Sequence, residues 1–92
     1  MAENDEEKLA RAYRVLAETA AEFGIVIDGP GQMIDFGYLP SDEVQRFGQK
    51  IREQQYSIDP RDFLRWRERG VQCNVGALVS ELAGKDDTPG ND

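Results

Sequence analysis

Apolar residues at helical spacing are the feature that most constrains how this chain folds. Between Asn4 and Phe23 such residues recur at alternating steps of four and three, and Gly24 then suits the left-handed position after a helix end. We therefore expect a helix from about Asn4 to Phe23. Its buried stripe is expected to consist of Leu9, Tyr13, Leu16, Ala20 and Phe23. The charged residues on the opposite side are expected to face solvent: Glu7, Arg11, Arg14 and Glu18.

A second helix is predicted from Ser41 to about Gln55. Ser41 is suited to the N-cap, and the two acidic residues after it lie where the helix dipole favours negative charge. Gly48 falls within the apolar stripe of this helix, although a glycine inside a helix costs roughly 0.5–1 kcal/mol relative to alanine. We expect a neighbouring backbone to approach closely at Gly48. The stripe itself consists of Val44, Phe47 and Ile51.

Two more helices are predicted, and each is preceded by a residue suited to the N-cap. Asp59, followed by Pro60 at the first helical position, predicts a third helix that ends at Gly70. Asn74 predicts a fourth helix that runs to about Ala83. The side of the fourth helix that is expected to be buried consists of Val75, Leu78, Val79 and Leu82.

Residues 25–38 change from helical spacing to alternation. The sequence Gly29-Pro30-Gly31 is a turn signal between two runs rich in residues that favour strands. The simplest prediction is a short β-hairpin with one apolar face, in which the paired residues are Ile27 with Ile34 and Ile25 with Phe36. Because an isolated hairpin is marginally stable in water, it must pack on the helices, or the segment is an ordered loop instead.

Together these segments predict a mainly α protein, a small single-domain bundle of about four helices with a short β-hairpin at 25–38. A chain of 92 residues has room for one core. The helical domain is expected to span residues 1–83, with the first few residues frayed. Residues 84–92 combine glycine, proline and acidic residues, a composition that cannot bury enough surface to order itself. We expect a disordered acidic tail there.

Composition removes several kinds of catalytic chemistry. The sequence has no histidine and one cysteine, Cys73, so Ser–His and Cys–His nucleophile pairs and the usual zinc sites are absent. We expect Cys73 to be a small buried hydrophobic residue rather than a reactive thiol. No enzymatic activity, cofactor or metal site is predicted. The sequence shows neither a secretory signal nor an apolar run of roughly 20 residues, so we expect a soluble cytoplasmic protein with no membrane partner.

Charge is distributed unevenly along the chain, whose formal net charge is −7. Residues 1–45 carry three basic and ten acidic side chains, whereas residues 46–69 carry seven basic and four acidic ones. Folding can therefore pair the two signs or leave them as separate surface patches. Two candidate sets of partner-binding residues follow from this division: the arginines Arg61, Arg65 and Arg69, and the aspartates Asp28 and Asp35.

The third predicted helix has an arginine stripe and an apolar side. At about 100° per residue, Arg61, Arg65 and Arg69 form one exposed stripe. The opposite side carries the apolar residues Phe63, Leu64 and Trp66. Arg67 falls on this apolar side. We expect either that its aliphatic stem packs there while its guanidinium reaches water, or that it pairs with a carboxylate from another segment.

These features favour a small acidic, non-enzymatic regulator or inhibitor that binds a protein partner. Arginine and tryptophan are favoured at the centres of protein interfaces, which makes the arginine-rich helix one candidate docking face. The acidic majority favours a second mode, in which Asp28, Asp35 and their neighbours imitate the charge of nucleic acid. Inhibitors of that type are encoded by phages and other mobile elements. The N-terminal apolar stripe is also compatible with a homodimer.

The alternative function is a helix-turn-helix transcriptional regulator that binds DNA through residues 41–70. Arg61 and Arg65 would then lie near the start of the recognition helix. The net charge of −7 and the acidic residues Asp62 and Glu68 within that helix argue against it, because nonspecific DNA affinity depends on neutralising phosphates. Nucleic acid is therefore the less favoured partner.

Overall fold

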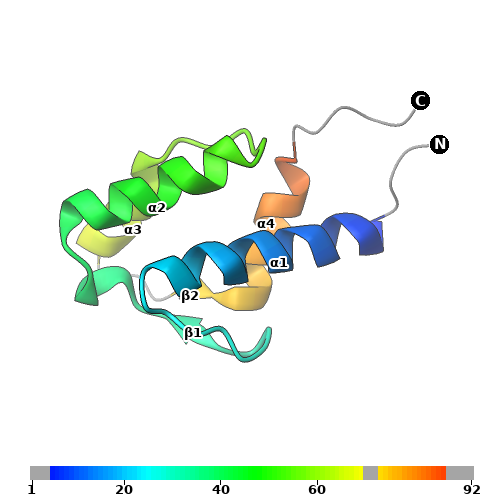
Figure 1. Ribbon diagram of the computed structural model, residues 1–92, viewed down its shortest axis with the longest axis horizontal. Coiled ribbons are helices and arrows are strands. Elements are labelled where there is room, and N and C mark those ends of the chain that lie inside the picture. Colours follow the sequence, from blue (N-terminus) through cyan, green and yellow to red (C-terminus); the bar gives the residue numbers. More distant parts are fainter. Residues whose placement is uncertain (1–4, 70–72, 87–92) are drawn as a thin grey trace.

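The computed structural model of this chain describes residues 5–69 and 73–86, of which most are helical. The prediction of a mainly α fold is confirmed, because four α-helices and a two-stranded antiparallel sheet account for the regular structure of these residues (Figure 1). In chain order the elements are α1 (Asp5–Glu22), β1 (Met33–Ile34), the 3₁₀ helix η1 (Phe36–Tyr38), α2 (Ser41–Glu53), α3 (Arg61–Glu68), β2 (Cys73–Asn74) and α4 (Val75–Gly84).

The four helices pack as two pairs. α1 lies against α4, and α2 lies against α3, while contacts between α1 and α2 join the pairs (Figure 1). η1 packs on α3, and β2 leads directly into α4. No helix in residues 5–69 and 73–86 is long and apolar enough to cross a membrane.

A cluster of phenylalanine rings forms the core between α2, α3 and η1. The rings of Phe36, Phe47 and Phe63 pack edge to face, with centroids 5.2–5.4 Å apart. All three side chains are buried. Phe23, just after α1, extends the cluster on one side and Trp66 on the other. These aromatic residues lie just after α1 and in η1, α2 and α3, so the cluster connects four segments that are distant in the sequence.

The buried face of α1 is wider than the predicted stripe, and the predicted residues at the two ends of the stripe are not fully buried. Leu16 and Ala20 are buried as expected, but Leu9 is exposed. Tyr13 and Phe23 are only partly buried. The other buried side chains of α1 are Ala12, Val15 and Thr19. α1 contacts both α4 and α2, so its buried face spans more than one narrow stripe. The helix end was predicted closely, since Gly24 adopts the left-handed conformation with φ of 79°.

Arg11 does not face solvent, contrary to expectation. Its Nη1 lies 2.9 Å from Oδ2 of Asp86, and its Nη2 donates a hydrogen bond to the backbone oxygen of Gln54 at 2.7 Å. The guanidinium also lies over the ring of Tyr56, 4.9 Å from its centroid. We call these four residues the Arg11 clasp. It connects α1 with the segment after α2 and with the residues after α4.

The predicted pairing within residues 25–38 is wrong, although a turn does occur at Pro30 and Gly31. β1 pairs with β2 instead, so that Ile34 faces Cys73 and Met33 faces Asn74 in antiparallel register. Ile27 and Ile25 lie outside any strand.

The side chain of Gln32 binds two backbone groups in the first half of this segment. Its Nε2 donates to the backbone oxygen of Val26 at 2.7 Å, and its Oε1 accepts from the backbone N–H of Asp28 at 2.6 Å. The first half of the segment therefore satisfies these backbone groups locally instead of through a partner strand. The second half finds its partner 40 residues away in β2.

α2 begins at Ser41, which was predicted to be the cap residue before the helix. Ser41 is its first helical residue and Pro40 occupies the cap position, with no side-chain capping bond. The expected close approach at Gly48 is confirmed. A Cβ added there would lie 2.6 Å from the backbone oxygen of Pro60 and 3.1 Å from the ring of Phe63. Glycine therefore allows α2 to pack closely against the start of α3.

The side-chain cap predicted for α4 is confirmed, whereas Pro60 occupies the cap position of α3 with no side-chain capping bond and Asp59 lies one residue before it. Asp59 Oδ1 accepts a hydrogen bond from the backbone N–H of Arg61 at 2.9 Å, and Asn74 Oδ1 accepts from that of Ala77 at 3.0 Å. The predicted buried side of α4 is also confirmed: Val75, Leu78, Val79 and Leu82. The predicted end of the third helix at Gly70 lies outside the described residues.

The fold extends beyond the predicted domain end at Ala83. Gly84 is the last residue of α4, the backbone oxygen of Lys85 accepts from Ser57 N–H at 2.8 Å, and Asp86 forms an antiparallel bridge with Tyr56. Residues 84–86 are thus part of the fold, not of a disordered tail as expected. The rest of the predicted tail, 87–92, and the predicted frayed start, 1–4, lie outside the described residues.

Candidate protein-binding surface

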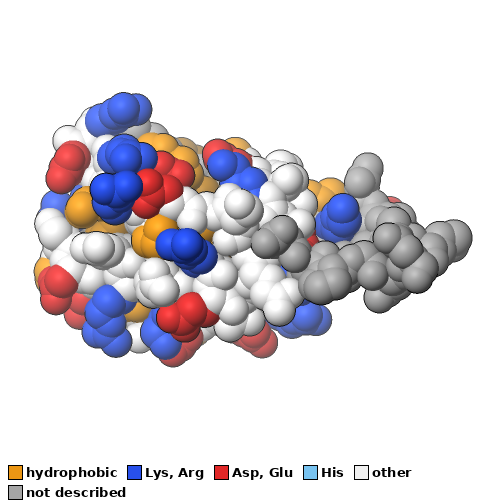
Figure 2. Space-filling view, turned by 90° about the horizontal axis from the view of Figure 1, so that it is seen from above, with side chains coloured by type: hydrophobic (Ala, Val, Ile, Leu, Met, Phe, Trp, Pro, Cys, Tyr) orange, Lys and Arg blue, Asp and Glu red, His pale blue; other side chains and the backbone are white. Residues whose placement is uncertain are grey.

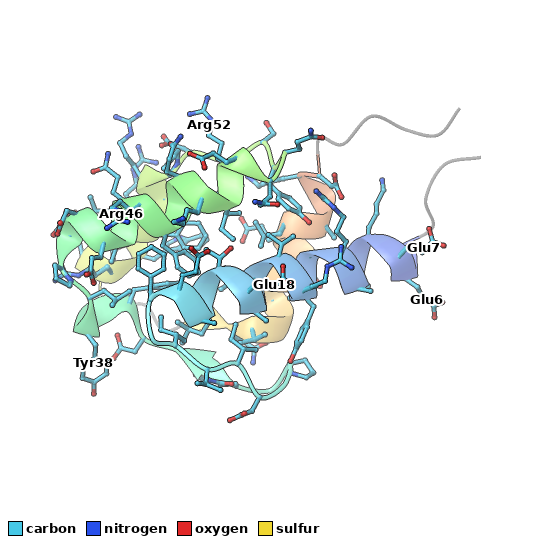
Figure 3. All side chains as sticks on the ribbon, viewed as in Figure 1. Glu6, Glu7, Glu18, Tyr38, Arg46 and Arg52 are labelled. Atoms are coloured by element: carbon cyan, nitrogen blue, oxygen red, sulfur yellow. The ribbon has the colours of Figure 1, made fainter. Side chains whose placement is uncertain are left out.

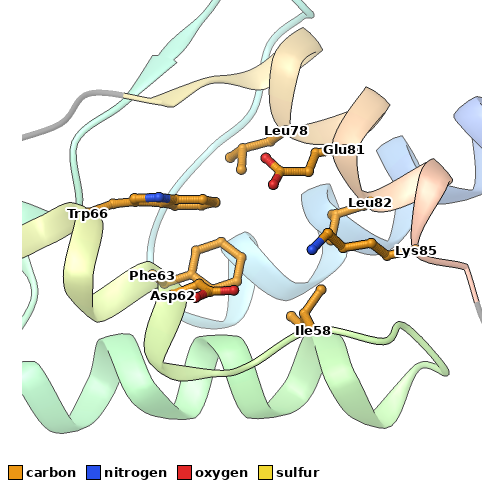
Figure 4. A pocket seen from close by; sticks show the side chains of 8 residues that line it. All are labelled: Ile58, Asp62, Phe63, Trp66, Leu78, Glu81, Leu82 and Lys85. Atoms are coloured by element: carbon orange, nitrogen blue, oxygen red, sulfur yellow. The ribbon is translucent and has the colours of Figure 1, made fainter.

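Two adjoining depressions lie between α3 and α4, and Trp66, Leu78 and Glu81 line both. One is a narrow cleft that continues to Ile58 and Lys85 and leaves about 10 Å³ of open volume (Figure 4). The other is wider, about 310 Å³, and continues to β1 and the start of α4. We call the two together the Trp66 groove, which is defined by Met33, Ile58, Trp66, Ala77, Leu78 and Glu81.

Trp66 is held in a fixed orientation at the centre of this groove. Phe63, three residues earlier on α3, is buried in the aromatic core and contacts the indole edge to face, with centroids 5.2 Å apart and an interplanar angle of 73°. Trp66 lies on the same side of α3 as Phe63, about one turn farther along the helix, and is partly exposed at the surface. Such a rigid, partly exposed aromatic side chain is suited to anchoring a partner.

Charge at the groove is concentrated on Glu81. Asp62, which borders the narrow cleft, is already paired with Arg65 at 2.7 Å. Glu81 is exposed, and no ion pair or hydrogen bond connects it to another residue in 5–69 or 73–86. Lys85 lines only the narrow cleft and does not reach the wider depression. Glu81 is therefore a carboxylate without an ion pair among the described residues, beside an apolar surface and with Lys85 across the narrow cleft only.

Cys73 lies at the inner edge of the wider depression and is buried, as predicted. Burial raises the pKa of its thiol to about 11, and the negative charge of Glu81 acts in the same direction. At neutral pH the thiol is thus protonated and weakly nucleophilic. Cys73 packs as a small apolar residue.

Within the described part of the chain, no group of three Cys, Asp or Glu side chains is placed to hold a metal ion.

The arginine stripe of α3 is exposed, but two of its members are neutralised locally. Arg61 Nη2 lies 3.1 Å from Asp59 Oδ2, and Arg65 pairs with Asp62 and, at 3.7 Å, with Asp59. The hydrogen bond from Arg61 lowers the pKa of the Asp59 carboxyl and raises the pKa of the guanidinium. Arg69 is exposed at the end of the helix. The stripe therefore presents less free positive charge than its sequence suggests.

The two aspartates proposed as binding residues occupy different local settings. Asp35 starts η1, since its Oδ1 accepts from the backbone N–H of Gly37 at 2.8 Å. The side chain of Asp28 is exposed beside the Gly29 turn. No ion pair among the described residues joins either aspartate to the arginine stripe. The predicted site residues thus do not form one site.

Surface charge elsewhere on α2 and α3 is mixed. In Figure 2, basic, acidic and apolar side chains alternate over the face that carries α2. Arg46 and Arg52 project from α2 (Figure 3), whereas Lys50 pairs with Glu22 at 3.1 Å. Residues 54–60 separate α2 from α3, a longer connection than the three or four residues of a helix-turn-helix. These features do not favour DNA recognition.

Arg67 contacts the backbone rather than a carboxylate. Its Nε donates to the oxygen of Leu39 at 2.7 Å, and its Nη1 lies 3.5 Å from Oγ of Ser41. The expected special position on the apolar side of α3 is therefore confirmed, but its partner is a carbonyl group just before α2. Arg67 holds the end of α3 against the 39–41 segment.

Replacing Arg67 with alanine is expected to lower the free energy of unfolding by about 1.5–3 kcal/mol, because a partly buried hydrogen bond from a charged donor is lost. Arg65→Ala is the matched control on the same helix. That change removes an exposed ion pair and is expected to cost less than about 1 kcal/mol. Urea denaturation of both variants measures the difference. Equal losses would mean that the Leu39 contact contributes no more than a surface pair.

Comparison with known proteins identifies no relative of this chain: no protein-family model, curated protein or solved structure matches it. The candidate surface is therefore argued from geometry alone. Trp66 was recognised in the sequence as an interface-type residue, but Glu81, Ala77 and Met33 were not, because they reach the groove only through the packing of α4 and β1 beside α3.

Proposed function

We propose that this protein is a non-enzymatic regulator or inhibitor that binds a protein partner through the Trp66 groove. The observation that carries the proposal is a tryptophan, fixed by Phe63, at the centre of a mostly apolar surface depression. Tryptophan is enriched among the residues that dominate binding energy, and such residues lie in pockets near the interface centre.

The chemistry of the groove supports binding rather than catalysis. Its one thiol, Cys73, has a raised pKa, and the sequence contains no histidine to activate a nucleophile. Of its two carboxylates, Asp62 is paired with Arg65, which leaves Glu81 without an acid–base partner of its own. The lining is otherwise apolar apart from Asn74 and Lys85.

The groove is favoured over the two surfaces suggested by charge alone. A partner that docked on Arg61 and Arg65 would have to displace or share Asp59 and Asp62, which already pair with them. Imitation of nucleic acid by Asp35 is weakened because this carboxylate caps η1. The arginine mode thus requires charges that Asp59 and Asp62 already pair, and Arg69 and Asp28 are the exposed members of the two sets whose side chains have neither an ion pair nor a hydrogen bond among the described residues.

The proposal is tested with two variants on α4. Ala77 is exposed and lines the groove, whereas Ser80 is exposed and lies outside it, so Ala77→Arg and Ser80→Arg add the same side chain at matched positions. Proteins captured from the source cells are compared for wild type and both variants, and a purified captured partner is then titrated. Ala77→Arg is expected to weaken its binding at least about tenfold, which is about 1.4 kcal/mol, and Ser80→Arg about twofold at most.

Two outcomes contradict the proposal. If Ala77→Arg leaves the affinity unchanged while Arg61→Ala and Arg65→Ala abolish it, the arginine stripe is the docking face. If the protein instead binds random duplex DNA tightly at about 50 mM salt, with an affinity that falls steeply by about 200 mM, the DNA-binding alternative gains support.

A further inference from the structure

We infer that the Trp66 groove receives an arginine or lysine side chain of the partner, held between the indole of Trp66 and the carboxylate of Glu81. This inference rests on the proposed function and specifies the chemistry of the partner. It concerns the wider depression, where Glu81 is the one charged residue among those that line it.

The side of the Trp66 indole opposite Phe63, which Leu78 borders, is the side that faces such a cation. Phe63 packs on one side of the indole, whereas Leu78 and Glu81 lie on the other side, and the Glu81 carboxylate points toward the groove (Figure 4). Tryptophan is the best aromatic partner for a cation, and removal of water strengthens the attraction. The aliphatic stem of arginine or lysine also suits the apolar surface of Leu78 and Ala77.

Glu81 makes a neutral occupant unfavourable. Any apolar segment that covers the groove takes water away from this carboxylate, which has no ion pair within the described residues. A carboxylate that loses water without gaining a partner is costly, so an occupant that supplies a positive charge is favoured over a neutral one. Lys85 would repel a cation in the narrow cleft, which places the partner's charge toward Met33 and Ala77 instead.

The test uses synthetic peptides and the natural fluorescence of the protein. Trp66 is the only tryptophan in the sequence, so a change in its emission reports directly on the groove. The probe is a short peptide without tryptophan in which one arginine is flanked by leucines. Its control carries citrulline, which has the shape of arginine without the charge. Both are titrated against wild type and against Glu81→Gln, a neutral replacement at an exposed position.

On wild type, citrulline is expected to weaken binding about tenfold relative to arginine, and on Glu81→Gln about twofold at most. The inference is overturned if the two peptides bind wild type equally, if the preference for arginine persists in Glu81→Gln, or if Trp66 emission does not saturate up to about 1 mM peptide. A different result contradicts the proposed function, namely that Ala77→Arg leaves capture of the protein partner intact. Equal peptide affinities together with loss of capture in Ala77→Arg would retain the groove and reject its cation specificity.

Discussion

Replacing Phe47 with alanine is expected to lower the free energy of unfolding by about 3–5 kcal/mol, the range for loss of a buried aromatic side chain. Its ring is fully buried, with its centroid 5.2 Å from that of Phe36, 5.3 Å from Phe63 and 5.6 Å from Phe23. The change therefore opens a cavity between segments from four parts of the chain. Since a domain of this size is stabilised by about 5–15 kcal/mol in total, much of the folded population can be lost.

The matched control is Tyr38→Ala, which removes an aromatic side chain that is 88% exposed on η1. That variant is expected to stay within about 0.5 kcal/mol of wild type. Chemical denaturation gives the midpoint and slope for both proteins. A similar midpoint for Phe47→Ala and Tyr38→Ala would contradict the assignment of the aromatic cluster as the main core.

The helices could be predicted because their signals are local. Asn74 caps α4, and Asp59 accepts a hydrogen bond from the backbone N–H of Arg61 at the start of α3. The spacing of Val44, Phe47 and Ile51 places all three on one buried face. These patterns depend on residues within a few positions of each other. Helical periodicity therefore carries enough information to define α2 and α4 without knowledge of the tertiary contacts.

The strand pairing could not be predicted in the same way. Ile34 pairs with Cys73, and nothing near either residue indicates the other. The turn signal at 29–31 indicates a nearby partner, but in the structure the side chain of Gln32 bonds to the backbone groups of Val26 and Asp28. A sheet of two residues per strand depends on tertiary packing, because such a small sheet has little stability of its own.

Most of the candidate binding surface also could not be predicted from local sequence patterns. Helical spacing alone places Phe63 and Trp66 on one side of α3 and predicts the arginine stripe, yet it does not show that Asp59 and Asp62 neutralise two of the arginines. The groove requires the placement of α4 beside α3. Glu81 therefore becomes a candidate binding residue only in the folded protein.

Replacing Asp86 with alanine is the second change expected to be severe, at about 3 kcal/mol, because it leaves the charge of Arg11 partly buried without its carboxylate. The Asp86 side chain is 3% exposed and that of Arg11 is 20% exposed, and their atoms approach to 2.9 Å. The remaining hydrogen bond from Arg11 to the Gln54 carbonyl and its contact with the Tyr56 ring cannot neutralise the charge. Thermal and urea unfolding both measure the loss.

Two comparisons separate a buried charge from an ordinary surface pair. Lys50→Ala breaks the exposed pair with Glu22 and is expected to cost less than about 1 kcal/mol. The double variant Arg11→Met/Asp86→Ala removes both charges of the clasp and is expected to be more stable than Asp86→Ala alone, because no unpaired charge remains buried. If Asp86→Ala costs no more than Lys50→Ala, the Arg11 clasp does not stabilise the fold. If the double variant is less stable than Asp86→Ala, Arg11 stabilises the fold through Gln54 and Tyr56 more than its unpaired charge destabilises it.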